Sequence, residues 1–145
     1  RCGEIHGKKG KAMMIDSIRT YMITCPYLDD ERVINVDYLT NELSYSIEPI
    51  PSDPYVKRFV DGGGIKQFQF AFTSKESYDA SETIGINQFY EQFSEWIELQ
   101  NDLGVYPFAE CTGIEIMTSG YLFDSESALA RYQIQLRVLY ERQGN

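Results

Sequence analysis

The sequence has few of the residues that most enzyme and metal sites need. Its only histidine is His6, which lies in a basic leader, residues 1–12, and not in the body of the chain. Cys2, Cys25 and Cys111 are an odd number at wide spacing with no Cys-x-x-Cys pair, so we expect free thiols and no disulfide framework or zinc site. The lack of a histidine in the body argues against Ser-His-Asp and Cys-His catalysis.

Long apolar runs are also missing. No run approaches the roughly 20 residues of a membrane-spanning helix, and no apolar segment typical of a signal peptide is seen. We therefore expect no membrane partner and a cytosolic protein. The aromatic fraction is 14%, with 11 Tyr and 8 Phe, and this abundance favours sheet and interface surfaces.

Basic residues are scarce outside the leader. Residues 1–12 hold four basic residues against one acidic residue, whereas residues 13–145 hold 9 basic against 21 acidic, a balance of −12. Such a body repels phosphates, so we expect no sequence-specific nucleic acid partner. The contrast predicts that 1–12 is a tag or upstream extension, with a mobile basic arm as the alternative, and that 13–145 forms one domain.

The run 55–74 predicts a β-hairpin. Its turn is Asp61-Gly62-Gly63-Gly64, where glycines adopt positive φ at little cost; a tip that orders on contact with a partner is the alternative. The glycines lack the lysine and the following helix of a phosphate loop. After the turn, three phenylalanines alternate with polar or small residues and share one face of a strand: Phe68, Phe70 and Phe72.

Apolar periodicity predicts two helices, over 14–25 and 86–100, which end before Pro26 and near Gly104. Further strands are expected over 34–38, 43–47, 112–119 and 131–140, with connections at 49–54, 75–85 and 120–127. A helix over 125–132 is the alternative start of the last segment. These elements predict an α+β fold, mostly antiparallel β-sheet with two main helices packed on one face. The phenylalanine face should pack on the aromatic stripe of the second helix, Phe89, Phe93 and Trp96.

No pattern predicts a catalytic, cofactor or metal site. Asp29-Asp30-Glu31 is interpreted as a solvated turn and not as a cation site, because no calcium-type loop follows it. Glu91, Glu95 and Glu98 are interpreted as the solvent face of a helix.

The expected interface residues lie on the hairpin and on the last strand. Amide side chains suit either a wet sheet surface or a protein interface, and a Gly63→Pro substitution in the tip is expected to abolish assembly without unfolding the domain. The proline loop 49–54 and the sheet edges are further candidates. The predicted set is Asp61, Gly62, Gly63, Gly64, Gln67, Gln69, Gln133 and Gln135.

Several phrases resemble the small minor capsid proteins of tailed phages and prophages of Gram-positive bacteria. They include I-R-T-Y-M-I-T-C-P-Y-L, S-Y-S-I-E-P-I-P-S-D-P-Y-V-K-R-F-V-D-G, F-Y-E-Q-F-S-E-W-I and T-S-G-Y-L-F-D. The resemblance runs from about Met14 to Arg142, and members of this family are similar in size and gene setting to tail terminators.

The resemblance implies a structural protein and not an enzyme. It implies a ring, commonly of six subunits, that ends tail-tube growth and docks to the head connector. The implied partners are other copies of the chain, the tail tube protein and the connector protein, and the implied location is the virion, with the host cytoplasm during assembly. An acidic lumen would repel DNA that passes through the ring. Alternatives are another head-tail connector or capsid-associated protein, a small enzyme, or a module that binds a host factor.

Overall fold

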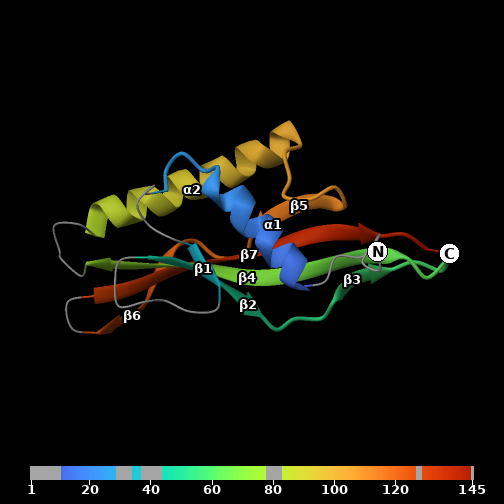
Figure 1. Cartoon of the computed structure of the whole chain (residues 1–145), viewed down its shortest axis with the longest axis horizontal. Coiled ribbons are helices and arrows are strands. Elements are labelled where there is room, and N and C mark those ends of the chain that lie inside the picture. The colour runs from blue at the N-terminus through green and yellow to red at the C-terminus, as the bar shows by residue number, and fades with distance from the viewer. Residues whose placement is uncertain (1–10, 29–33, 37–43, 78–82, 127–128, 145) are drawn as a thin grey trace.

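Two long strands, β4 and β7, form the centre of a single sheet that is covered on one face by two helices (Figure 1). The computed structural model describes residues 11–28, 34–36, 44–77, 83–126 and 129–144. Over these residues the elements are α1 (Lys11–Ile23), β1 (Ile34–Val36), β2 (Tyr45–Ile50), β3 (Tyr55–Arg58), β4 (Gly64–Ser77), α2 (Thr83–Leu103), β5 (Cys111–Ile116), β6 (Tyr121–Glu126) and β7 (Leu129–Arg142).

The central strands pair along their whole lengths. Each has 14 residues, and the antiparallel register runs from Gly64 opposite Arg142 to Ser77 opposite Leu129. Two shorter strands lie end to end along each outer side of this pair, β3 and β2 beside β4, and β5 and β6 beside β7. The short β1 adds to β2 in parallel, and the other described pairings are antiparallel. The α+β fold with a mostly antiparallel sheet is therefore confirmed.

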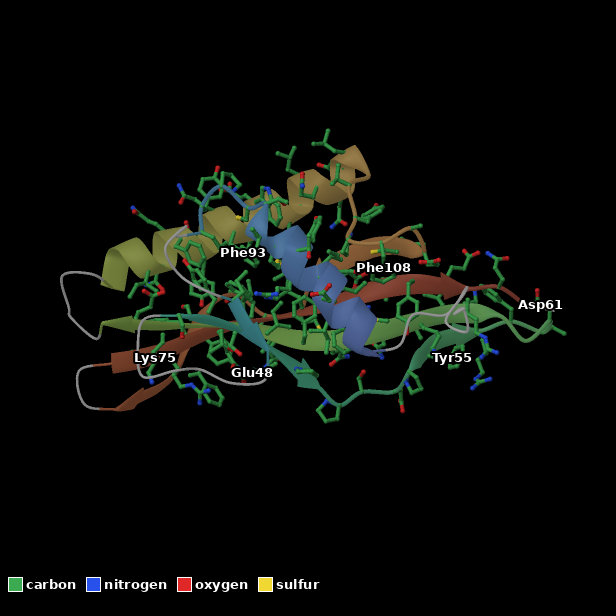
Figure 2. All side chains as sticks on the ribbon, in the orientation of Figure 1. Glu48, Tyr55, Asp61, Lys75, Phe93 and Phe108 are labelled. Carbon is green, nitrogen blue, oxygen red and sulfur yellow. The ribbon has the colours of Figure 1, made fainter. Side chains whose placement is uncertain are left out.

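Both helices lie on the same face of the sheet, as predicted. Phe70, Phe72 and Phe93 are fully buried, and the rings of Phe72 and Phe93 stack with their centroids 5.0 Å apart. Figure 2 shows Phe93 between α2 and the sheet. Each fully buried side chain of this size contributes roughly 1.5 to 3 kcal/mol. The predicted pairing of the phenylalanine face with the stripe on α2 is the centre of the core.

Both helix ends follow from local chemistry. Cys25 precedes Pro26, whose ring disfavours helical geometry for the residue before it, and α1 ends at Ile23. The end of α2 is followed by Gly104 at φ 72°, the left-handed conformation that glycine adopts most cheaply.

Three predicted connections were wrong in part. Pro49 and Ile50 belong to β2 and not to a loop, and they pair with Phe70 and Gln69 of β4. The described pairing of β1 with β2 ends at Ile47, so no described strand needs an N–H from Pro49 on the other side, and a strand tolerates proline at such a position. β4 continues to Ser77, and α2 begins at Thr83. The segment 120–127 contains β6, which was missed because a register shift between Leu122 and Asp124 disrupts the alternation.

The alternative helix over 125–132 is wrong where the structure describes it, since 129–132 pair with β4. Lys11 and Ala12, which were assigned to the leader, belong to α1. Other predictions fall outside the described residues: the leader over 1–10 with Cys2 and His6, the turn at 29–31, and the strand positions 37, 38 and 43.

Candidate functional site

The sheet face turned away from the helices is polar. On β4 and β7 it carries the residues that alternate with the buried aromatic and aliphatic ones, and the register places Gln69 opposite Arg137 and Thr73 opposite Gln133. The structure thus brings four predicted interface residues onto one face. This surface is called the polar face below, and its residues are Gln67, Gln69, Gln133, Gln135 and Arg137.

Two of these glutamines are held by a tyrosine of β6. Gln133 Nε2 and Gln135 Nε2 donate to the Tyr121 hydroxyl at 2.6 and 3.1 Å. The backbone N–H of Gln135 also donates to Thr118 Oγ1 at 3.2 Å. Gln133 is only 6% exposed, so it is part of the interior more than of an accessible surface.

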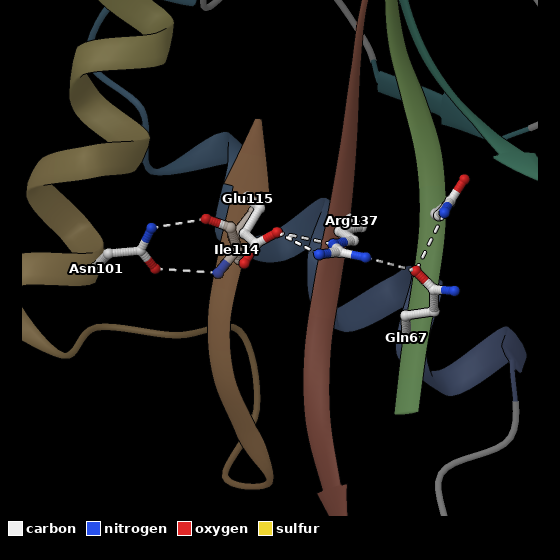
Figure 3. A network of polar contacts seen from close by, with 6 residues as sticks. Gln67, Asn101, Ile114, Glu115 and Arg137 are labelled. Carbon is white, nitrogen blue, oxygen red and sulfur yellow. Dashed lines mark hydrogen bonds and ion pairs between the residues drawn. The ribbon is translucent and has the colours of Figure 1, made fainter. Parts of the chain in front are cut away.

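The other two glutamines join a network that crosses the sheet (Figure 3). Gln67 Oε1 accepts bonds from Gln69 Nε2 at 3.1 Å and from Arg137 Nη1 at 3.2 Å. Arg137 also forms an ion pair with Glu115 through two nitrogens, at 2.6 and 2.8 Å. Two-nitrogen contacts of this kind fix orientation better than a single surface ion pair does. The polar face is therefore an ordered surface.

Glu115 was not predicted as a site residue. Its partner Arg137 lies 22 positions further along the chain, and only the pairing of β5 with β7 brings the two together. A second ion pair joins Glu48 of β2 to Arg131 of β7 at 3.4 Å. Neither pairing has a local sequence signal, because each depends on which strands become neighbours.

The tip of the hairpin is a tight turn that packs against the C-terminal strand. Phe59 N–H donates to the Gly63 carbonyl at 2.8 Å, and Gly63 N–H donates to Asp61 Oδ1 at 2.9 Å. Gly62 has φ 93°. Asp61 and Gly62 are exposed, whereas Gly63 and Gly64 are buried.

The expectation that Gly63→Pro would spare the fold needs correction. A Cβ atom at Gly63 would lie 2.6 Å from the carbonyl oxygen of Arg142 and from the backbone nitrogen of Gly144. Proline would also remove the N–H that bonds Asp61. This substitution would damage the hairpin itself, so it cannot test assembly alone.

Three cations surround Tyr55 at the same end of the sheet, and a fourth, Lys57, lies over the Phe59 ring. The Arg58 guanidinium lies 3.9 Å from the Tyr55 ring centroid, Lys66 Nζ lies 5.3 Å from it, and Arg142 Nη1 donates to the phenol oxygen at 2.6 Å. The Arg142 hydrogen bond lowers the pKa of Tyr55, and the charges of Arg142, Lys66 and Arg58 act in the same direction. With Lys57 they form the basic cluster: Lys57, Arg58, Lys66 and Arg142.

Within the described residues, none of these four cations makes an ion pair. Figure 2 shows Tyr55 and Asp61 at the end of the sheet opposite to Lys75. Sequence reasoning missed the basic cluster because its members come from β3, β4 and β7, and only the register gathers them.

The exposed side of α2 is acidic. The helix contains no lysine, arginine or histidine, and four of its carboxylates are exposed. Near its first half lies a depression of about 580 Å³, lined in part by Glu91, Ser94 and Glu95. The Ser94 hydroxyl donates to the Tyr90 carbonyl at 3.0 Å. We call the four exposed carboxylates the acidic stripe: Glu91, Glu95, Glu98 and Asp102.

The described cysteines are buried free thiols. Burial raises the pKa of Cys25, and it raises the pKa of Cys111 to about 11. Both are therefore protonated at neutral pH, and a protonated thiol is a poor nucleophile and metal ligand. Within the described residues, no group of three or more His, Cys, Asp or Glu side chains is placed to hold a metal ion.

Neither α1 nor α2 is long and apolar enough to cross a membrane. Comparison of the chain with protein-family models gave no match, and comparison with curated proteins gave no significant one.

Proposed function

We propose that this chain is a structural subunit of a tailed-phage virion that forms a ring at the head-proximal end of the tail. In this role it ends growth of the tail tube and presents a surface to the head connector. The proposal joins the resemblance of the sequence to small minor capsid proteins with one observation on the fold, the presence of two unlike sheet edges.

At the end of the sheet that carries the hairpin, the strand order is β3-β4-β7-β5. The β3 edge is basic and is followed by the turn, whereas the β5 edge is joined to α2 by Asn101. A ring needs each subunit to contact its neighbours through two different surfaces, because head-to-tail contacts close into a ring when the rotation allows it. The unlike β3 and β5 edges meet this requirement.

The polar face supports the same role. It is hydrogen-bonded and only partly accessible, and arginine is enriched where proteins meet each other. Because the helices cover the opposite face, the polar face is the side on which a flat partner, such as the end of a tail tube, could dock without disturbing the core.

Deletion of the gene from the encoding phage or prophage, followed by electron microscopy of the particles, tests the proposal. We expect overlong tails and heads without tails, and we expect the wild-type chain supplied from a plasmid to restore normal virions. Tails of normal length with unjoined heads would indicate a head-tail connector. Unchanged, infectious virions would reject a virion role.

A further inference from the structure

The β3 hairpin carries apolar side chains that the chain itself does not cover. Val56 is 46% exposed, Phe59 is 40% exposed and Val60 is fully exposed. Within the described residues β3 pairs only with β4, and no described strand covers its other edge. Adjacent apolar residues on an open strand edge are a feature that natural sheets usually protect.

Charges next to this patch favour an acidic partner. Lys57 and Arg58 lie between its apolar residues, and Lys66 and Arg142, which contact Tyr55, complete the basic cluster. These are four of the 9 basic residues in a body with 21 acidic ones. No described carboxylate pairs with them, so the cluster keeps its positive potential.

A second exposed apolar patch lies at the C-terminal end of α2. Leu99, Leu103 and Val105 are 52%, 64% and 44% exposed. Glu98 and Asp102 lie beside them, and the last turn of α2 has no basic residue. The C-terminal end of the helix dipole is negative and adds to the negative charge of these carboxylates. A cation would stabilise this end of α2, and α2 itself supplies none.

The two patches lie on opposite sides of one subunit. β3 borders β4, whereas the end of α2 is joined to β5 beyond β7, because Asn101 bonds the backbone of Ile114 at 2.7 and 3.0 Å. The exposed side of α2 also points away from the sheet (Figure 1). The patches therefore cannot contact each other within one molecule.

We propose that the β3 patch of one copy docks on the C-terminal end of α2 of a second copy, in a head-to-tail contact. Val56, Phe59 and Val60 would meet the apolar residues of α2, while Lys57 and Arg58 would meet Glu98 and Asp102. This contact would be the interface between subunits of the proposed ring, and its role in the virion rests on the proposed function. The contact itself can be measured with the purified protein, without a phage. A second copy fits better than nucleic acid, because the patch is apolar as well as basic and the whole body is acidic.

Sedimentation velocity of the purified chain at low and high salt tests the contact. We expect concentration-dependent association that weakens as salt rises, because exposed charges are screened. Charge reversal by Lys57→Glu with Arg58→Glu should raise the dissociation constant about a hundredfold, and Glu98→Lys with Asp102→Lys should act alike. A mixture of the two reversed proteins should associate again, with the two variants alternating head to tail, because each patch of one variant then meets a patch of opposite charge on the other.

Asp16→Lys is the matched control, since Asp16 is an exposed acid on α1, outside both patches, and association should be unchanged. A wild-type chain that stays monomeric at its highest soluble concentration, or reversed variants that fail to restore each other, would overturn the contact. Salt-sensitive binding to a DNA duplex that is lost with Lys57→Glu and Arg58→Glu, without self-association, would assign the cluster to nucleic acid instead. If the mixed variants associate again but deletion of the gene leaves normal particles, the contact stands and only the virion role is rejected.

Discussion

Thr73 and Ser74 are neighbours on β4 that are both fully buried, yet their hydroxyl groups have different surroundings. Ser74 Oγ lies 2.6 Å from the Tyr90 hydroxyl, which itself donates to the Tyr132 carbonyl at 3.0 Å. The Ser74 hydroxyl must therefore be the donor to Tyr90, since the phenol has one proton. Thr73 Oγ1 has no hydrogen-bond partner in the described chain, and neither has Ser46 Oγ on the paired strand.

Thr73→Val should therefore raise the free energy of unfolding, by about 1 kcal/mol, because it removes an unsatisfied buried hydroxyl and keeps the shape. Ser74→Ala should lower it by about 1 kcal/mol or more, because it removes a satisfied hydroxyl next to a buried phenol. Urea unfolding of both variants and the wild type measures the difference. Equal destabilisation by the two substitutions would show that Thr73 Oγ1 has a partner in solution.

At the scale of the elements, one side chain connects α2 to an edge of the sheet. Asn101 Nδ2 donates to the Ile114 carbonyl at 2.7 Å, and Asn101 Oδ1 accepts from the Ile114 N–H at 3.0 Å (Figure 3). The side-chain amide thus satisfies both backbone groups of Ile114, as a neighbouring strand would. This part of the β5 edge is consequently closed to pairing with another sheet, so the expectation that sheet edges contact a neighbour does not extend to Ile114.

Asn101→Ala should lower the free energy of unfolding by about 1 to 3 kcal/mol, because it leaves a backbone donor and a backbone acceptor without partners. Asn101→Asp should cost nearly as much, since a carboxylate cannot donate to the Ile114 carbonyl. Asn87→Ala is the control, because Asn87 is an exposed asparagine on the same helix. Thermal and urea unfolding compare the three variants, and an Asn101→Ala protein as stable as the Asn87→Ala protein would contradict the role of the link.

At the scale of the whole molecule, several ionisable groups are buried where the helices meet the sheet. Tyr21 and Cys25 are contributed by α1 and the residues after it, and Cys111 by the start of β5. Tyr21 also stacks on Trp96 of α2 with centroids 5.2 Å apart. Burial raises the pKa of all three groups. The packing of both helices on the sheet therefore depends on these groups staying protonated.

We expect stability to fall as pH rises above 9.0. The unfolded Cys111 thiol loses its proton near its ordinary value of 9.0, whereas the folded thiol keeps it up to about 11, so the folded state binds more protons in this window. The limiting slope is about 1.4 kcal/mol per pH unit for each fully linked proton. Urea unfolding between pH 8 and 10.5 measures it, and Cys111→Ala should have a shallower slope than the wild type. Parallel pH profiles would contradict this assignment.

Much of the architecture could be predicted because it depends on local periodicity. The alternating Phe68, Phe70 and Phe72 define one apolar face of a strand, and Phe89 and Phe93 define one apolar face of a helix. Because both faces must be buried, few ways remain to pack the helix on the sheet. The β6 strand could not be predicted, because a register shift interrupts its alternation and its pairing with β7 holds it in place. Pro49 was assigned to a loop for a similar reason, since whether a strand tolerates proline depends on which strand pairs beside it, and among the described residues β1 pairs with β2 only up to Ile47.

The sequence by itself determined the α+β class, the hairpin, the aromatic core and the side of its own strand on which each glutamine lies, because side-chain direction in a strand alternates with period two. Only the tertiary structure decided that Tyr121 holds Gln133 and Gln135, that Arg137 pairs with Glu115, and that Arg58, Lys66 and Arg142 gather around Tyr55. These contacts join residues far apart in the chain. Their geometry depends on strand order and register, which local patterns do not encode.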